Sequence, residues 1–328
     1  MTIRIERLPD NPVIYPYMDQ RMGDNINGPS LIRAPEWLSD PLGKYYLYFA
    51  HHKGRYIRLA YADDICGPWQ IYSPGALDVT ASLFEKEDPP VAAATAAGRA
   101  EWSEKLGDDF LYAHVASPDV HVDHENKKIL MYYHGLLGNG DQQSRIAQSG
   151  DGIHFESMEP LLGPPYFRGF RYRQYIYAIA WGGELLRAST WYGPFEKGPR
   201  IIPDQPAKGS CHGFRHGAVC CVGDTLYVFY TRVGDEPERI VYLTVKLDAD
   251  WNAWQATDCL ELLGPQESWE GGDCALAPSM VGAAEKRLRE VRDPCVFEDF
   301  DGARYLLYAG AGESAIGIAR LEGIQPVT

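Results

Sequence analysis

The sequence lacks an excess of positive charge, and it lacks long hydrophobic runs. Its 31 Lys and Arg residues stand against 45 Asp and Glu residues, which gives a formal net charge of −14 at pH 7. Because an acidic chain is repelled by phosphate backbones and anionic lipids, we expect neither nucleic acid nor a membrane as a partner. The longest apolar runs are strand-sized, well short of the roughly 20 residues that cross a bilayer.

The sequence also lacks the marks of an oxidising compartment. The first residues, MTIRIERLPDNP, contain no apolar segment followed by a small-residue cleavage site. The seven Cys residues are odd in number, scattered, and without CxxC spacing, so neither a disulfide framework nor a zinc site is indicated. We therefore expect buried thiols and a cytoplasmic protein.

Aromatic residues, glycine and proline are abundant. The chain of 328 residues holds 21 Tyr, 8 Trp, 33 Gly and 23 Pro. Aromatic side chains favour pleated strands, and Gly and Pro favour the turns between them. Helical patterns are confined to residues 100–106 and 283–291. The composition therefore predicts an all-β protein.

One strand pattern recurs along the chain. Residues 45–50, 129–134, 226–231 and 304–309 are similar apolar runs, each preceded and followed by another strand-like run. A shorter fifth unit begins at Tyr175 and ends at Glu196. Five four-stranded units predict a five-bladed β-propeller as a single domain over residues 1–328. The two helical patterns fall in insertions near 91–113 and 266–291. Two β-sandwiches are the alternative.

Short motifs connect these units to known families. Residues 60–69, AYADDICGPW, resemble a blade edge in glycoside hydrolase family 43, and residues 189–195 repeat it. Residues 292–297, RDPCVF, resemble the RDPxVF motif of family 32, in which the Asp stabilises the sugar in the transition state. Family 117, which employs a His as acid, is a further analogue. The chain resembles a divergent member, because Asn27-Gly28-Pro29 replaces the carboxylate of the first blade.

The resemblance implies that inner-strand starts and second-strand ends face the substrate. The starts supply Asn27, Asp119, Gln174, His216 and Asp293; the ends supply His51, His52, His134, Arg232 and Glu313. Glycoside hydrolysis commonly uses two carboxyl groups. We expect Asp119 as the base and Asp293 as the acid or the group that holds the sugar, with His216 as the alternative acid in the same pocket.

The remaining predicted contacts are with substrate. They comprise Asn27, His51, His134, Arg145, Gln174 and Arg232, together with Trp269 and Glu270 in the second insertion. The predicted function is a glycosidase of carbohydrate metabolism that acts at the end of a small oligosaccharide or glycoside, without a cofactor. The alternative to a protein without a cofactor is one that binds a calcium ion in the centre of the channel. A sugar-binding propeller without catalysis, and a sugar-acid lyase or isomerase using His216, stay open as alternative functions.

Overall fold

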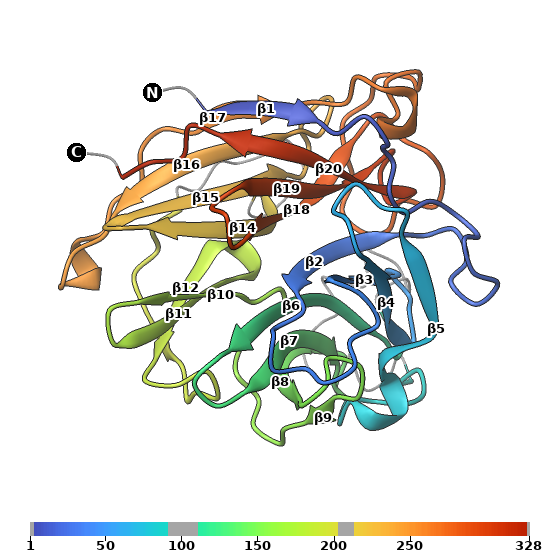
Figure 1. The fold of residues 1–328 in the computed structure, drawn as a ribbon. Helices are drawn as coiled ribbons and strands as arrows, with labels where there is room; N and C mark the ends of the chain where they lie inside the picture. The colour runs from blue at the N-terminus through green and yellow to red at the C-terminus, as the bar shows by residue number, and fades with distance from the viewer. Residues whose placement is uncertain (1–2, 91–110, 203–212, 327–328) are drawn as a thin grey trace.

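A computed structural model describes residues 3–90, 111–202 and 213–326. This part of the chain forms five antiparallel sheets of four strands each, arranged as blades around a ring (Figure 1), with short 3-10 turns and no α-helix. The predicted five-bladed β-propeller is therefore confirmed, and the alternative of two β-sandwiches is wrong. None of the described helices is long and apolar enough to cross a membrane.

Each blade runs outward from its innermost strand in the order of the chain. The first blade contains β2 (Asn27–Arg33), β3 (Tyr45–Ala50), β4 (Tyr56–Ala62) and β5 (Gln70–Asp78). The second contains β6 (Val115–Asp123), β7 (Lys128–Leu136), β8 (Gln142–Ser149) and β9 (Glu156–Ser157). The third contains β10 (Arg168–Tyr172), β11 (Tyr175–Ala180), β12 (Glu184–Ala188) and β13 (Glu196–Lys197). The fourth contains β14 (Phe214–Val222), β15 (Thr225–Arg232), β16 (Ile240–Lys246) and β17 (Leu260–Leu263).

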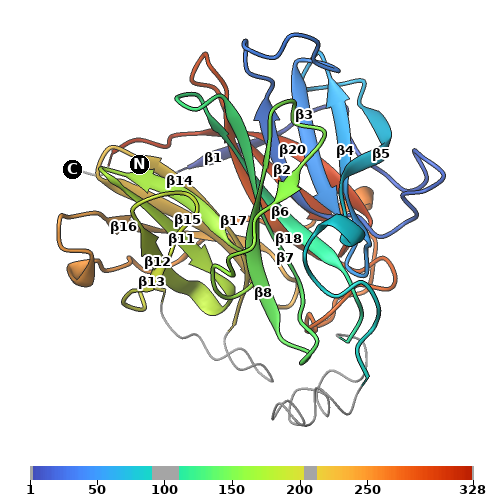
Figure 2. The same ribbon diagram turned by 90° about the horizontal axis from the view of Figure 1, so that it is seen from below.

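The fifth blade is built from both ends of the chain. It contains β18 (Val291–Glu298), β19 (Arg304–Gly310), β20 (Ala315–Glu322) and, as its outer strand, β1 (Arg4–Arg7). In the pairing of β1 with β20, Arg4 lies opposite Glu322 and Arg7 opposite Ala319. Figures 1 and 2 both place the two chain ends beside each other at this blade. Pairing of the first strand with the last closes the ring.

The core lies between the blades, which explains the continuous apolar runs of the second strands. Each of five clusters of buried side chains fills the space between two neighbouring sheets. In β3, Leu47 packs toward the fifth blade beside Leu307, while Tyr48 packs toward the second blade beside Met131. Because both faces of such a strand are buried, its sequence does not alternate with polar residues.

The inner strands share a bulge near their starts. The register with the second strand shifts between Asn27 and Ser30 in β2, and at the corresponding places in β6, β14 and β18. Within three of these bulges Gly28, Ser117 and Asp293 have positive φ values, and Tyr166, just before β10, does too. Non-glycine residues held in this left-handed region store strain and cluster at functional sites.

The structure differs from the predictions for the second insertion and for the start of the third blade. The pattern at 100–106 lies outside the described residues, and the segment 283–291 is not helical. That segment forms backbone hydrogen bonds with the strand ends of the fifth blade instead, such as Gly312 N to Glu290 O. The third blade starts at β10, so Tyr175 begins its second strand. Described cysteines are free thiols, of which Cys220 is buried and the others are half-buried.

Candidate active site

A small cavity of about 20 Å³ lies where the inner strands of the propeller begin. Its wall combines inner-strand starts with second-strand ends, as the sequence predicted for the substrate-facing side. We call it the histidine pocket. It is lined by Asn27, His52, Tyr112, His114, Ala116, Ser117, His134, Gln142, Tyr166 and His216.

His216 and Asp293 form a buried carboxylate–imidazole pair at this pocket. His216 Nδ1 contacts Asp293 Oδ1, and the backbone N–H of Gly28 donates to Asp293 Oδ2 over 3.2 Å. The two side chains are 9% and 1% exposed. Burial, together with the neighbouring Arg215 guanidinium, lowers the pKa of His216 well below its usual range. The imidazole is therefore neutral at pH 7, with Nδ1–H on Asp293 and with Nε2 as a free acceptor. No described group hydrogen-bonds Nε2.

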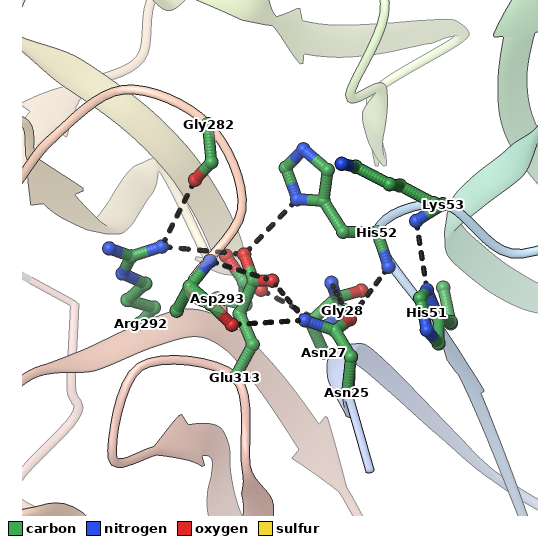
Figure 3. A network of polar contacts seen from close by, with 12 residues as sticks. Asn25, Asn27, Gly28, His51, His52, Lys53, Gly282, Arg292, Asp293 and Glu313 are labelled. Carbon is green, nitrogen blue, oxygen red and sulfur yellow. Dashed lines mark hydrogen bonds and ion pairs between the residues drawn. The ribbon is translucent and has the colours of Figure 1, made fainter. Parts of the chain in front are cut away.

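Glu313 and His52 form a second such pair. His52 Nδ1 lies 3.2 Å from Glu313 Oε1, and Asn25 Nδ2 donates to Glu313 Oε2 over 2.6 Å (Figure 3). Burial by itself would raise the pKa of Glu313, but His52, Arg292 and Asn25 favour the carboxylate so strongly that the pKa is lowered overall. Glu313 is therefore ionised at neutral pH. Figure 3 shows this carboxylate next to Asp293 and Asn27.

A buried ion network holds Glu313 from behind. Arg292 Nε donates to Glu290 Oε2 over 2.7 Å, and its NH1 lies 3.3 Å from Glu313 Oε1. Arg215 Nε donates to Glu238 Oε1 over 2.9 Å, and Arg292 Nε lies 3.5 Å from Glu238 Oε2. All five side chains are buried. Buried charges are tolerated only when they are paired, so the network fixes the position of the Glu313 carboxylate.

The rest of the histidine pocket is uncharged. Burial lowers the pKa of His114 to about 4, lowers that of His134 well below its usual range, and raises the pKa of Tyr166 to about 12. The Tyr166 ring lies between the rings of His134 and His216, with centroid separations of 4.4 and 4.2 Å. His134 Nδ1 is buried without a hydrogen-bond partner. The pocket thus presents unoccupied ring nitrogens to a hydrogen-bonding group of a ligand.

A larger cavity of about 860 Å³ adjoins the histidine pocket at His52. We call it the large cavity. It lies between the first and fifth blades, and Asn25 and Glu313 reach it from the two sides. Three aromatic residues, Tyr15, Tyr17 and Trp269, line it together with acidic and basic side chains. Its size is within the usual range of small-molecule sites, roughly 300–1,000 Å³.

Six of the predicted site residues are at or beside these cavities, with Trp269 in the wall of the large cavity. Asn27, His134 and His216 line the histidine pocket, and Asp293 holds His216. His51 is in the wall of the large cavity, where its Nδ1 accepts the backbone N–H of Lys53 over 2.9 Å. Burial lowers its pKa to about 4.

Asp119 does not join Asp293. The bulge of β6 comprises Ser117 and Pro118, so Asp119 takes the register position next along the strand, whereas Asp293 is itself inside the bulge of β18. Asp119 Oδ2 lies 2.7 Å from His121 Nε2 and accepts the Gly169 N–H over 2.7 Å. It lines neither the histidine pocket nor the large cavity.

Three further predicted contacts are directed elsewhere. Arg145 donates to the backbone oxygen of Glu159 on the outer part of the second blade. Gln174 is exposed in the turn between β10 and β11, because the inner strand of that blade precedes it. Arg232 pairs with Asp235 over 2.9 Å. None of these three side chains lines the histidine pocket or the large cavity.

The second insertion contributes packing as well as a cavity wall. Trp269 lines the large cavity, but its ring also packs on Tyr308 and occupies the space above Gly310 and Gly317. Glu270 is fully buried and is paired with Arg7, with 2.7 Å from Arg7 Nε to Glu270 Oε1. Glu270 is therefore held in the interior by Arg7, and it lines neither the histidine pocket nor the large cavity.

Four residues of the site, His52, Glu313, His114 and Tyr166, lie outside the predicted catalytic and substrate-contact sets. His52 and Glu313 were recognised as strand-end positions, and their recurrence across blades was the available signal. His114 and Tyr166 precede inner strands, but β10 was not recognised, so Tyr166 carried no signal. The described residues contain no group of three or more His, Cys, Asp or Glu side chains arranged to hold a metal ion.

Comparison with solved structures defines the class of fold. A putative glycoside hydrolase from Parabacteroides distasonis superposes with a TM-score of 0.64 at 11% identity, covering 98% of this chain and 97% of that one. A family 43 β-xylosidase/α-arabinofuranosidase from a compost metagenome, in complex with xylotriose, gives 0.57 at 12% identity and covers 99% of each chain. An N-acetylgalactosamine deacetylase from F. plautii gives 0.57 at 10% identity, covering 96% and 95%. The chain thus has the five-bladed propeller fold of glycoside hydrolases, as its motifs predicted.

Sequence comparison then identifies the family. No protein-family model matches the chain. The uncharacterized protein R118 of Acanthamoeba polyphaga mimivirus is 34% identical over 338 aligned positions, which cover 97% of this chain and 90% of the viral protein. The chain belongs to the same family as that protein.

Proposed function

We propose that this protein is a glycoside hydrolase whose reaction takes place where the histidine pocket meets the large cavity. The observation that carries the proposal is the convergence of two buried carboxylate–imidazole pairs, Asp293–His216 and Glu313–His52, on one pocket. The proposal keeps two carboxylates, with Glu313 in place of the expected Asp119, and assigns the proton transfers to the histidines that they hold. Structures of this fold that bind sugars, such as the xylotriose complex, support a carbohydrate substrate.

His216 is the proposed general base. Its neutral Nε2 takes a proton from water as the water oxygen attacks the anomeric carbon, and Asp293 stabilises the imidazolium that forms. The sequence suggested His216 as the acid, but a lowered pKa is suited to proton acceptance. Because the base form exists above that pKa, the reaction is expected to slow at acidic pH.

His52 is the proposed general acid. It lines both cavities, and its Nδ1 faces the ionised Glu313 carboxylate. As the bond between the anomeric carbon and the glycosidic oxygen breaks, His52 gives a proton to the departing oxygen. His52 becomes neutral in this step, and Glu313 then faces the positive charge that develops on the sugar ring.

A panel of aryl glycosides and short oligosaccharides tests the proposal. We expect wild type to hydrolyse at least one of them, and His216→Gln, Asp293→Asn and His52→Gln each to lower kcat by about 100-fold or more. The double variant of His216 and Asp293 is expected to be no worse than the single ones, because the two residues act as a unit. Melting temperatures of all variants separate lost chemistry from lost folding.

His154→Gln is the matched control. His154 forms the same kind of pair with Asp151, at 2.8 Å, on an exposed turn of the second blade. Its removal is expected to leave kcat unchanged. Wild-type rates in folded His216→Gln and Asp293→Asn would contradict the proposal. Sugar binding without turnover would favour a binding propeller, and elimination products from a sugar acid would favour a lyase.

A further inference from the structure

A third cavity, of about 230 Å³, lies on the third blade. We call it the blade-3 cavity, and its walls include Pro164, Trp181, Glu184, Lys197 and Arg200. Pro164 lies just before the inner strand β10, and Trp181 directly follows the second strand β11. These are the same kinds of position that line the histidine pocket in the other blades. The blade-3 cavity therefore opens on the face of the propeller that carries the candidate active site.

One aromatic ring separates the blade-3 cavity from the histidine pocket. The ring of Trp181 lies 5.3 Å from that of Tyr166, at an angle of 34°, and the Tyr166 ring in turn lies 4.2 Å from that of His216. The backbone N–H of Trp181 donates to Pro165 O over 2.9 Å, which fixes the start of the short turn that carries the ring. Trp181 is thus held beside the proposed base by way of Tyr166.

The position of the third blade in the ring indicates how the three cavities are arranged relative to one another. The inner strands follow one another around the ring in chain order, and β18 returns to β2 (Figure 1). In a ring of five blades, the third lies opposite the junction of the fifth and the first. The large cavity occupies that junction. The large cavity, the histidine pocket and the blade-3 cavity therefore follow one another across the face of the propeller.

The lining of the blade-3 cavity suits a sugar ring. Trp181 offers a flat apolar face, and Lys197 and Arg200 offer hydrogen-bond donors beside the Glu184 acceptor. Lys197 pairs with Glu184, so both heads are held at the rim. The large cavity at the other end has its own aromatic residues. Each end of the row thus combines stacking with hydrogen bonding.

We propose that the blade-3 cavity is a subsite for one sugar residue of an oligosaccharide that crosses the face of the propeller. In this arrangement the chain extends from the large cavity, past His52 and His216, to Trp181. The inference rests on the proposed function and specifies its substrate as an oligosaccharide of at least three residues. It differs from the action at a chain end that the sequence suggested, because such action needs room on one side of the cleaved bond.

Chain-length dependence tests this subsite. The probes are oligomers of two to five residues of the sugar that wild type hydrolyses or binds. They are titrated against the His216→Gln variant, in which turnover is expected to be at least about 100-fold slower. We expect affinity to rise roughly tenfold once the chain reaches the blade-3 cavity. Trp181→Ala is expected to remove that increment while the affinity for the shortest oligomer stays unchanged, and Trp181→Phe is expected to retain most of it.

Two further variants keep the test decisive. Lys197→Ala combined with Arg200→Ala changes exposed side chains only, so it is expected to fold and to lower the increment even if Trp181→Ala does not fold. Trp191→Ala, on the same blade but stacked on His121, is expected to leave the increment intact. If affinity rises with chain length equally in wild type and in both cavity variants, the subsite is overturned. The hydrolase proposal would still stand. Absence of binding to every oligomer would overturn both.

Discussion

At the scale of single residues, Arg168 connects the inner strands of three blades. Its Nε donates to Gly217 O over 2.9 Å, and its NH1 donates to the backbone oxygens of Ser117 and Phe167 over 3.2 and 3.0 Å. One buried guanidinium thereby connects the inner strands of the second, third and fourth blades. The acceptors are buried backbone oxygens, and no solvent can replace the Arg168 donor there. The side chain of Arg168 therefore has a structural role.

Arg168→Met is therefore expected to lower the free energy of unfolding by about 3–5 kcal/mol, because several buried acceptors lose a charged donor. Urea unfolding measures the effect. Arg171→Met is the control on the same strand, since its exposed side chain contacts only the Trp191 ring in the described structure. Equal stability of the two variants would rule out the bridging role of Arg168.

Asp119 is the residue on which sequence and structure differ most. Its contacts are His121 and the Gly169 N–H, and it belongs to neither of the two proposed pairs. We expect Asp119→Asn to keep kcat within about threefold of wild type, while Asp293→Asn loses about 100-fold or more. Steady-state kinetics on one substrate decide the matter. Comparable losses in the two folded variants would restore the pairing of Asp119 with Asp293.

At the scale of elements, the closing strand β1 is secured by a side chain as well as by its ladder. Arg7 forms a two-point pair with the fully buried Glu270, at 2.7 and 2.9 Å, and also donates to Gly264 O. Glu270 in turn accepts the Tyr308 hydroxyl over 2.6 Å. The pair therefore joins the first strand of the chain to the insertion before the fifth blade.

Arg7→Met is expected to cost about 3–5 kcal/mol of stability, since it leaves a buried carboxylate without its partner. Arg4→Met, on the exposed face of the same strand, is expected to change stability by less than about 0.5 kcal/mol. Denaturant titrations of both variants at pH 7 provide the comparison. If Arg7→Met unfolds at the wild-type midpoint, β1 is held by its ladder with β20 alone.

At the scale of the whole molecule, buried neutral histidines determine the response to acid. Burial lowers the pKa of His51 and of His114 to about 4, and it lowers the pKa of His134 and of His216 well below the usual range. In the unfolded chain a histidine binds its proton near pH 6.5. Between pH 6.5 and about 4 the unfolded state therefore binds more protons, so stability that is fully present above pH 6.5 is lost as the pH falls.

Each such histidine contributes up to about 1.4 kcal/mol per pH unit to that slope. Unfolding free energies from pH 7.5 to 4.5 are expected to show a steep decline, and His114→Gln a shallower one. His124→Gln, which changes an exposed histidine, is expected to follow the wild-type slope. A pH-independent stability over this window, or the same slope in His114→Gln, would show that these imidazoles are protonated in the folded protein.

The sequence by itself determined the architecture. The second strand of each blade is buried on both faces between neighbouring sheets, so residues 45–50, 129–134, 226–231 and 304–309 are mainly apolar. That requirement is local and repeats with every blade, which is why five units could be recognised. The recurrence of polar residues at strand ends also predicted His216, Asp293 and the face on which they meet.

Only the tertiary structure decided which side chains meet. The bulges in β6 and β18 place Asp119 and Asp293 at different register positions, so the two acids next to prolines do not form a pair. Glu313 lies beside His52 because its carboxylate is held by Asn25, 288 residues away in the sequence, and by Arg292 on the inner strand of the fifth blade. Contacts between blades depend on how the blades are positioned around the ring. The residue pattern within one strand does not indicate which strand of another blade will face it.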